Sequence, residues 1–224
     1  LGYKDVKVNA LNQEIEVLEE KDASTNNNIE ISIDIKLQRY LQELFDGKSG
    51  SIVVMDARNG EIIAAASFPE YDSNIFARGI SQNEWNQMRN DFNHPFTNKI
   101  INGLYPPGSV IKMGVALSFL ENGIPENFTV NCSGSLPIGN RNFRCWKTTG
   151  HGNINFRSAI AESCDDFFYK GSLKLGINKI SHTLDKLGFG QLTGIDQINE
   201  FMGVNPNKEW KEKRLKKPWY IGET

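Results

Sequence analysis

The apolar positions of the 224-residue chain follow two different spacings. Residues 37–45 place apolar side chains on one face of a helix, and Asp34 just before them is a typical N-cap. Residues 51–55 and 61–65 are short, continuous apolar runs, and an Asn-Gly pair lies between them. Such a pair between two apolar runs is a strong hairpin signal. The pattern therefore predicts a helix followed by an antiparallel pair of strands.

The remaining segments are read from their composition. Residues 1–30 are polar and strand-like, which predicts a lead-in or linker. Residues 69–102 are polar and aromatic and predict short helices. Helices are also expected over residues 156–163 and 166–175, and the glycine that follows the second helix is expected to end it.

The segment from Ser109 to Leu120 carries apolar side chains in nearly every direction around a helix, which predicts a buried helix. Two prolines and a glycine precede it, so the helix is expected to begin at Ser109. Lys112 is the only cation of the segment. Ser109 and Lys112 are three residues apart, so their Cβ atoms are expected at about 5–6 Å on one helix face.

This pair suits nucleophilic catalysis. Desolvation disfavours the charged form of a lysine, and a neutral amine beside a hydroxyl is a general base next to a nucleophile. Free N–H groups in the first turn would stabilise the negative charge that develops at Ser109 during acyl transfer. The alternative is that Ser109 caps the helix and Lys112 extends to the surface. The pair alone does not decide between the two.

A second motif follows at residues 162–169, Glu-Ser-Cys-Asp-Asp-Phe-Phe-Tyr. The ordered combination of Ser109-x-x-Lys112 with Ser163-x-Asp165 resembles the penicillin-binding protein and serine β-lactamase superfamily. Taken alone, Ser163 and Asp165 would be read as a helix N-cap pair. Further segments narrow the resemblance to class B transpeptidases of the elongation-specific type, known as penicillin-binding protein 2: 105–112, 150–152, 187–190, 193–196 and 217–224.

The resemblance implies an α+β fold, an antiparallel sheet with helices on both faces and the Ser109 helix at its centre. It implies that residues 31–224 form a transpeptidase domain and that residues 1–30 are a linker or the end of a pedestal region. The third motif of the family, Lys-Ser/Thr-Gly, has no match after Asp165. Lys147-Thr-Thr-Gly150 lies between the first two motifs and is one residue too long. An incomplete catalytic domain that lacks its C-terminal part is therefore expected.

The resemblance also implies a reaction. Ser109 attacks the penultimate D-Ala carbonyl of a peptidoglycan stem peptide, and Lys112 takes the hydroxyl proton. Ser163 relays a proton to or from the amine, Asp165 stands where the family has Asn, and a second stem peptide resolves the acyl-enzyme. β-Lactams trap the same serine. A serine β-lactamase and a non-catalytic penicillin sensor remain alternatives with the same acylation site.

All three cysteines and one histidine form a second pattern: Cys132, Cys145, His151 and Cys164. Three thiolates and an imidazole are a closed ligand set for structural zinc. Some relatives of the family have a metal site at equivalent places, by the same resemblance. A disulfide such as Cys132–Cys145 with one free thiol, or three unrelated buried thiols, are the alternatives. Metal at Cys164 would fix the loop of the second catalytic motif.

Composition limits the partners. With 39% hydrophobic residues, 23% charged residues and a net charge of -2, the chain has no electrostatic basis for binding nucleic acid. No apolar run approaches the roughly 20 residues of a membrane-spanning helix. The resemblance implies a peptidoglycan stem peptide or lipid-linked precursor as substrate, no organic cofactor, and scaffold and glycosyltransferase partners of the elongation machinery. It also implies the periplasmic face of a bacterial inner membrane, with an anchor outside this chain.

Overall fold

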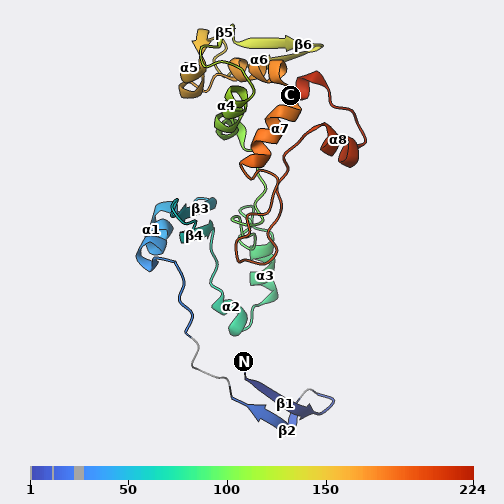
Figure 1. Ribbon diagram of the computed structural model, residues 1–224. Helices are drawn as coiled ribbons and strands as arrows, with labels where there is room; N and C mark the ends of the chain where they lie inside the picture. Colours follow the sequence, from blue (N-terminus) through green and yellow to red (C-terminus); the bar gives the residue numbers. More distant parts are fainter. Residues whose placement is uncertain (1, 12, 23–27) are drawn as a thin grey trace. The chain divides into compact units, whose positions relative to one another are not determined.

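A computed structural model describes residues 2–11, 13–22 and 28–224 (Figure 1). The chain divides into two compact units, Leu1–Phe68 and Pro69–Thr224. The expected boundary near residue 30 stays a prediction, and residues 23–27 of that linker lie outside the described residues. No helix in the described ranges is long and apolar enough to cross a membrane.

The first unit begins with a hairpin of β1 (Tyr3–Val8) and β2 (Glu14–Lys21). α1 (Ile35–Phe45) follows, and the Asp34 carboxylate caps it by accepting the N–H groups of the first turn. β3 (Gly50–Met55) and β4 (Ile62–Phe68) then pair antiparallel, so the predicted helix and hairpin are confirmed. α1 packs on β4, where the ring of Phe45 stacks on Phe68 at a centroid distance of 3.9 Å.

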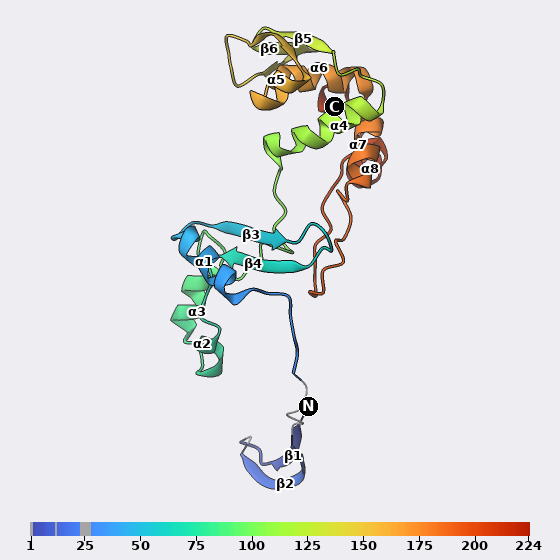
Figure 2. The ribbon, with the colours of Figure 1, turned by 60° about the vertical axis from the view of Figure 1, so that its left-hand side comes forward.

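The second unit contains most of the helices (Figure 2). The short helices expected between residues 69 and 102 are present, and all its strands pair antiparallel, β5 with β8 and β6 with β7. Its elements in chain order are α2 (Asn74–Ala77), α3 (Gln82–Arg89), the 3-10 turn η1 (Gly108–Ile111), α4 (Lys112–Glu121), β5 (Thr129–Cys132), β6 (Ser135–Ile138), β7 (Arg141–Arg144), β8 (Gly152–Asn155), α5 (Phe156–Ala161), α6 (Asp165–Leu175), α7 (Ile177–Lys186), α8 (Lys208–Leu215) and the 3-10 turn η2 (Ile221–Glu223).

The core of this unit forms where α4 and α6 meet. Phe119 of α4 is fully buried, and its ring lies near those of Phe156 and Phe168. Gly171 of α6 permits this approach, because a Cβ atom there would lie 2.2 Å from the Phe119 ring. α7 packs against α4, with Leu184 beside Gly114. The segments that carry Ser109 and Ser163 therefore attach to a tightly packed helical core.

Two expectations for the Ser109 helix are wrong. The chain makes a 3-10 turn over Gly108–Ile111, and the α-helix begins only at Lys112. Such turns are frequent at helix N-termini, and here Gly108 adopts a φ of 57°, which glycine reaches without strain. The helix is also not buried on all sides, since α6 and α7 cover only one face. The exposed apolar residues on α4 and the turn before it are Val110, Met113, Leu117 and Leu120.

The helices that flank the second motif agree closely with expectation. α5 ends at Ala161 and α6 begins at Asp165, one residue earlier than predicted. Gly176 ends α6, as the sequence indicates. Ser163 and Asp165 do not form an N-cap pair, because the cap position of α6 is Cys164 and carries no side-chain cap bond.

A buried lysine holds the last residues of the chain. Lys211 of α8 forms an ion pair with Glu223 and lies 4.7 Å from the centroid of the Tyr220 ring. The Lys211 ammonium, together with the backbone N–H of Tyr220, holds the pKa of Glu223 below its usual value. The indole N–H of Trp219 donates to the Thr224 hydroxyl at 2.9 Å in the same segment.

We expect acid to loosen this segment. A carboxyl whose folded pKa is lowered contributes stability above its unfolded value, about 4.3 for glutamate, and loses it as the pH falls through the lower folded value. The Trp219 indole N–H signal, followed by NMR, should therefore shift below about pH 4. Glu223→Gln should show the loosened signal already at neutral pH. A signal that stays unchanged in both experiments would contradict the role of this pair.

Candidate active site and metal centre

Lys112 lies at the centre of the candidate active site. Its Nζ donates to the Ser163 hydroxyl at 3.0 Å and to the Ser163 carbonyl at 2.8 Å. It also pairs with Asp165 Oδ1 at 2.5 Å. The Lys112 side chain is 12% exposed, so these contacts are shielded from solvent. The structure thus joins the first turn of α4 to the start of α6, two segments about fifty residues apart in the sequence.

Ser109 precedes this lysine on η1 and is exposed. Its hydroxyl has no hydrogen-bond partner within the part of the chain that the structure describes. The carboxylate beside Lys112 was not predicted from the sequence, and Lys112 Nζ lies 2.5 Å from Asp165 Oδ1. The cause is long-range packing of α6 on α4, which brings a charge that spacing along the helix does not reveal.

Ser163 is held in an unusual backbone conformation. Its φ is 51°, in the left-handed region that non-glycine residues seldom adopt. The turn between α5 and α6 is fixed to the end of α5, since the N–H groups of Ser163 and Cys164 donate to the carbonyls of Ile160 and Ala159. Such residues cluster at functional sites when their surroundings hold them in place. The turn directs both oxygens of Ser163 to Lys112.

Trp146 is a site residue that the sequence argument did not assign. Its backbone N–H donates to Asp165 Oδ2 at 3.0 Å, and its indole N–H donates to the Glu162 carbonyl at 2.8 Å. The ring itself is 63% exposed. The only signal in the sequence is that Trp146 directly follows Cys145. Trp146 thereby ties the loop after β7 to both ends of the second motif.

These contacts explain why an aspartate is suited to position 165. Each carboxylate oxygen accepts one hydrogen bond, Oδ1 from Lys112 and Oδ2 from Trp146. Asparagine replaces one of these oxygens by an NH2 group, so one of the two donors would face another donor instead of an acceptor. We expect Asp165→Asn to slow acylation by benzylpenicillin about tenfold, the loss of one hydrogen bond to a charged group. Asp165→Ala should slow it more than about a hundredfold, because both bonds are lost.

Stopped-flow or quenched mass spectrometry would give these second-order rate constants. Asp185→Asn is a matched control, because this exposed aspartate lies on the outer side of α7 and has no contact with Lys112. Equal rates for the Asn and Ala variants of Asp165 would contradict the two-acceptor argument.

Cys132, Cys145, His151 and Cys164 converge on one point. Their ligand atoms all lie within 4.8 Å of one another. His151 Nδ1 is 3.5 Å from Cys132 Sγ and 3.6 Å from Cys145 Sγ. A tetrahedral zinc ion with bonds of about 2.3 Å to sulfur and 2.0 Å to nitrogen separates its ligands by roughly 3.5–3.8 Å. The arrangement therefore has the donor set and the spacing of a tetrahedral metal site.

The other side of the His151 ring faces a carboxylate. His151 Nε2 is buried, 3.8 Å from Glu162 Oε2, and has no hydrogen-bond partner among the described residues. Metal-binding histidines commonly direct their second nitrogen to a carboxylate, which fixes the ring. Glu162 immediately precedes Ser163, so the candidate metal site and the second motif share one stretch of chain.

The three cysteines are free thiols. Burial, and to a smaller extent the neighbouring Cys132 thiol, raises the pKa of the Cys164 thiol to about 12. Burial alone would also raise the pKa of Cys145. Hydrogen bonds from backbone N–H groups, the strongest from Lys147, outweigh it and hold the pKa of this thiol below its usual value. A bound cation would take all three as thiolates, so binding it would release protons.

Comparison with known proteins identifies the family. A family profile described as "Penicillin binding protein transpeptidase domain" matches residues 50–218. The chain belongs to the penicillin-binding protein transpeptidase family. All four catalytic candidates lie inside the matched range.

Individual relatives agree with this assignment. The peptidoglycan D,D-transpeptidase MrdA of Escherichia coli K12 is 40% identical over 226 residues, covering 100% of this chain and 36% of the relative. MrdA of Haemophilus influenzae is 37% identical over the same length and is covered to 35%. This chain therefore spans about a third of the length of these transpeptidases.

Solved structures confirm the fold class. The Helicobacter pylori penicillin-binding protein 2 in complex with MreC matches with a TM-score of 0.84 and 50% identity, over 99% of this chain and 42% of that one. The Pseudomonas aeruginosa penicillin-binding protein 2 in complex with WCK 5153 matches with a TM-score of 0.80 and 36% identity, over 86% and 43%. The predicted α+β transpeptidase fold and its penicillin-binding protein 2 type are thus confirmed.

Proposed function

We propose that this chain carries the acylation site of a peptidoglycan D,D-transpeptidase. The observation that supports this most is the contact of Lys112 with both members of the second motif, Ser163 and Asp165, just after the exposed Ser109. The family assignment supplies the reaction class, acyl transfer. The substrate is a stem peptide, on a lipid-linked precursor or on the wall polymer, that ends in D-Ala-D-Ala.

The contacts of Lys112 with Ser163 and Asp165 support the following order of proton transfers. Ser109 Oγ attacks the penultimate D-Ala carbonyl, and its proton passes to Lys112. The terminal D-Ala leaves as a free amine with a proton delivered through the Ser163 hydroxyl, which is bonded to Lys112 Nζ. The Asp165 carboxylate stabilises the ammonium that Lys112 becomes. An amine of a second stem peptide then attacks the ester, and the same groups run in reverse.

We propose a structural zinc ion for the cluster of three cysteines and His151. The donor set, its spacing and its burial fit a closed tetrahedral site, and a closed site leaves no position for substrate. The ion would hold Cys164 between Ser163 and Asp165, and Cys145 beside Trp146. These residues of the chain then keep the second motif in register with Lys112.

The site of action and the partners are further parts of the proposal. The relatives are named as peptidoglycan transpeptidases, and one solved relative is bound to MreC. We infer a role in bacterial wall elongation at the periplasmic face of the inner membrane, with a scaffold protein and a glycosyltransferase as partners. Neither inference depends on the geometry of the active site.

The test is covalent labelling. Benzylpenicillin should add once to the chain, at Ser109, as read by intact mass and peptide mapping. An adduct that is lost within seconds would favour the β-lactamase alternative over a transpeptidase. An adduct that persists, together with no release of D-alanine from a peptide ending in D-Ala-D-Ala, would favour a penicillin sensor.

A further inference from the structure

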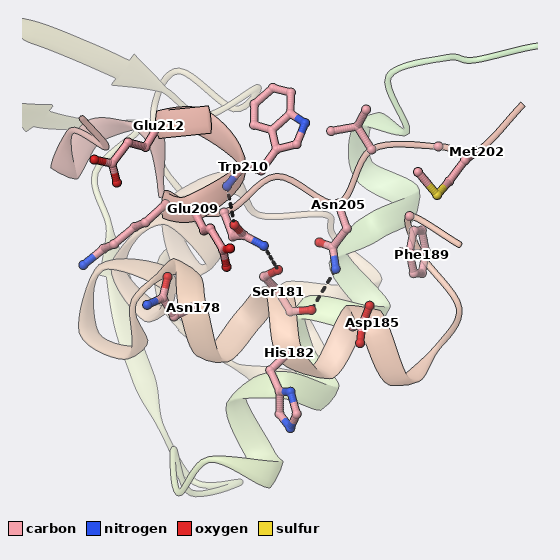
Figure 3. A pocket seen from close by; sticks show the side chains of 15 residues that line it. Asn178, Ser181, His182, Asp185, Phe189, Met202, Asn205, Glu209, Trp210 and Glu212 are labelled. Atoms are coloured by element: carbon pink, nitrogen blue, oxygen red, sulfur yellow. Dashed lines mark hydrogen bonds between the residues drawn. The ribbon is translucent and has the colours of Figure 1, made fainter. Parts of the chain in front are cut away.

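A second site lies on the outer side of α7. An open pocket of about 760 Å³ separates this helix from α8 and from the segment 202–207 that precedes it (Figure 3). The volume is in the range of about 300–1,000 Å³ typical of ligand sites. The face of α7 that borders the pocket carries Ser181 and Asp185, whereas Leu184 packs toward α4. The pocket is therefore separate from the Lys112 site.

Hydrogen bonds tie the segment 202–207 to α7 and fix the walls of this pocket in place. Asn205 Nδ2 donates to the Ser181 carbonyl at 2.8 Å, and Asn207 Nδ2 donates to the Ser181 hydroxyl at 3.3 Å. Asn207 also caps α8 by accepting the Trp210 N–H at 2.8 Å. Figure 3 shows Asn205 facing Ser181 across the bond between them. The opening is thus a built feature of the fold.

The lining offers free polar groups of both signs. Lys208, Glu212 and Asn178 make no side-chain hydrogen bond or ion pair with any described residue. Asn205 Oδ1, at the wall, is buried without a partner in the described part of the chain. This oxygen is covered by the protein, so hydroxyl and amide groups of a ligand would meet the exposed Lys208, Glu212 and Asn178 side chains instead.

The opposite end of the pocket is apolar. Phe189 and Met202 lie next to each other there and are 41% and 60% exposed (Figure 3). A ligand that matches both ends needs donors and acceptors along one edge and a C–H surface along the other. Hydroxyl-rich rings with N-acyl groups have this character, whereas an ammonium ligand would leave Lys208 and the apolar end unmatched.

We propose that this pocket binds N-acylated amino sugars of a glycan strand. The inference rests on the proposed function, since a peptidoglycan substrate carries such sugars beside its stem peptides. Lys208 and the Asn178 amide donate to hydroxyl and acyl oxygens, Glu212 accepts from hydroxyl groups, and Phe189 packs on a ring face. The site holds the polymer while Ser109 reacts with the peptide, and it takes no part in the chemistry.

The test is NMR titration of the ¹⁵N-labelled chain with tri-N-acetylchitotriose. Shifts should concentrate on the Asn178 side-chain amide, the Trp210 indole N–H and the backbone of 202–207, with a Kd of about 1 mM. The double variant Lys208→Ala, Glu212→Gln should weaken binding at least about tenfold. Lys179→Ala, Glu126→Gln is the matched control, since both residues are exposed and outside the pocket, and it should bind as the unaltered chain does.

The proposal is overturned if no NMR signals shift at 10 mM sugar, about ten times the expected Kd. It is also overturned if only signals of residues outside the pocket shift, or if both double variants weaken binding equally. Preferential binding of a sugar-free stem peptide in this pocket would overturn it as well. Benzylpenicillin labelling of Ser109 is run on the same samples. If Ser109 is labelled but the sugar does not bind, this inference alone is contradicted. If the sugar binds but Ser109 is not labelled, the proposed function is contradicted.

Discussion

Ser109→Ala is expected to abolish covalent labelling by benzylpenicillin. The substitution removes the only hydroxyl on the turn before Lys112, so no ester can form there. Removing the serine nucleophile of an acyl-transfer enzyme typically costs about 10⁴-fold or more in rate, which places residual labelling below detection. Intact mass after incubation checks this, and release of D-alanine from a D-Ala-D-Ala peptide should disappear in parallel.

The control for this variant is Ser73→Ala. Ser73 is also an exposed serine just before a helix, and it makes no side-chain cap bond. It should label normally. If Ser109→Ala still labels, the nucleophile has been assigned to the wrong residue. If the unaltered chain does not label but a version extended through the third motif does, Ser109 is correct and further chain completes the site.

Removing the proposed zinc ion is expected to destabilise the second unit strongly. Chain purified without chelator should hold about one equivalent of zinc, and Cys164→Ser should hold much less. A loss of only about 4 kcal/mol lowers the Tm of a chain of this size by about 8–16 °C. Structural zinc sites contribute more than that in small domains. Differential scanning calorimetry with and without chelator measures the change.

The design of this experiment separates metal from packing. Chelator should lower the Tm of the unaltered chain to that of Cys164→Ser and leave the variant itself unchanged. Ser172→Ala, at a buried serine on the same helix α6, should respond to chelator as the unaltered chain does. Less than half an equivalent of zinc, with all three thiols titratable, would contradict the metal site. Acylation by benzylpenicillin should slow with the metal removed, because the second motif is then less well held.

Local signals in the sequence were sufficient for much of the fold. The cap at Asp34 and the Asn-Gly turn each act over a few residues, and they predict α1 and the β3–β4 hairpin correctly. Gly176 likewise marks the end of α6. The 3-10 turn at Ser109 was missed because residues that start an α-helix also suit a tighter first turn.

Most members of the candidate site could be named from the sequence, but their contacts could not. The motif order pointed to Ser109, Lys112, Ser163 and Asp165, and the cysteine count pointed to the cluster with His151. The ion pair of Lys112 with Asp165 spans 53 residues and depends on how α6 packs on α4. The role of Trp146 rests on its backbone N–H, which every residue but proline has, so residue type carries no signal for it.

The left-handed backbone at Ser163 has a consequence for how this sequence can change. Glycine adopts such a φ at no steric cost, whereas a serine held there costs on the order of 1 kcal/mol or more. Selection for a more stable fold therefore favours a residue without a side chain at this position. Selection for the proposed proton transfer favours the hydroxyl that contacts Lys112. The turn between α5 and α6 is thus a place where thermal robustness and turnover are in direct conflict, and where variants improved in one are expected to lose the other.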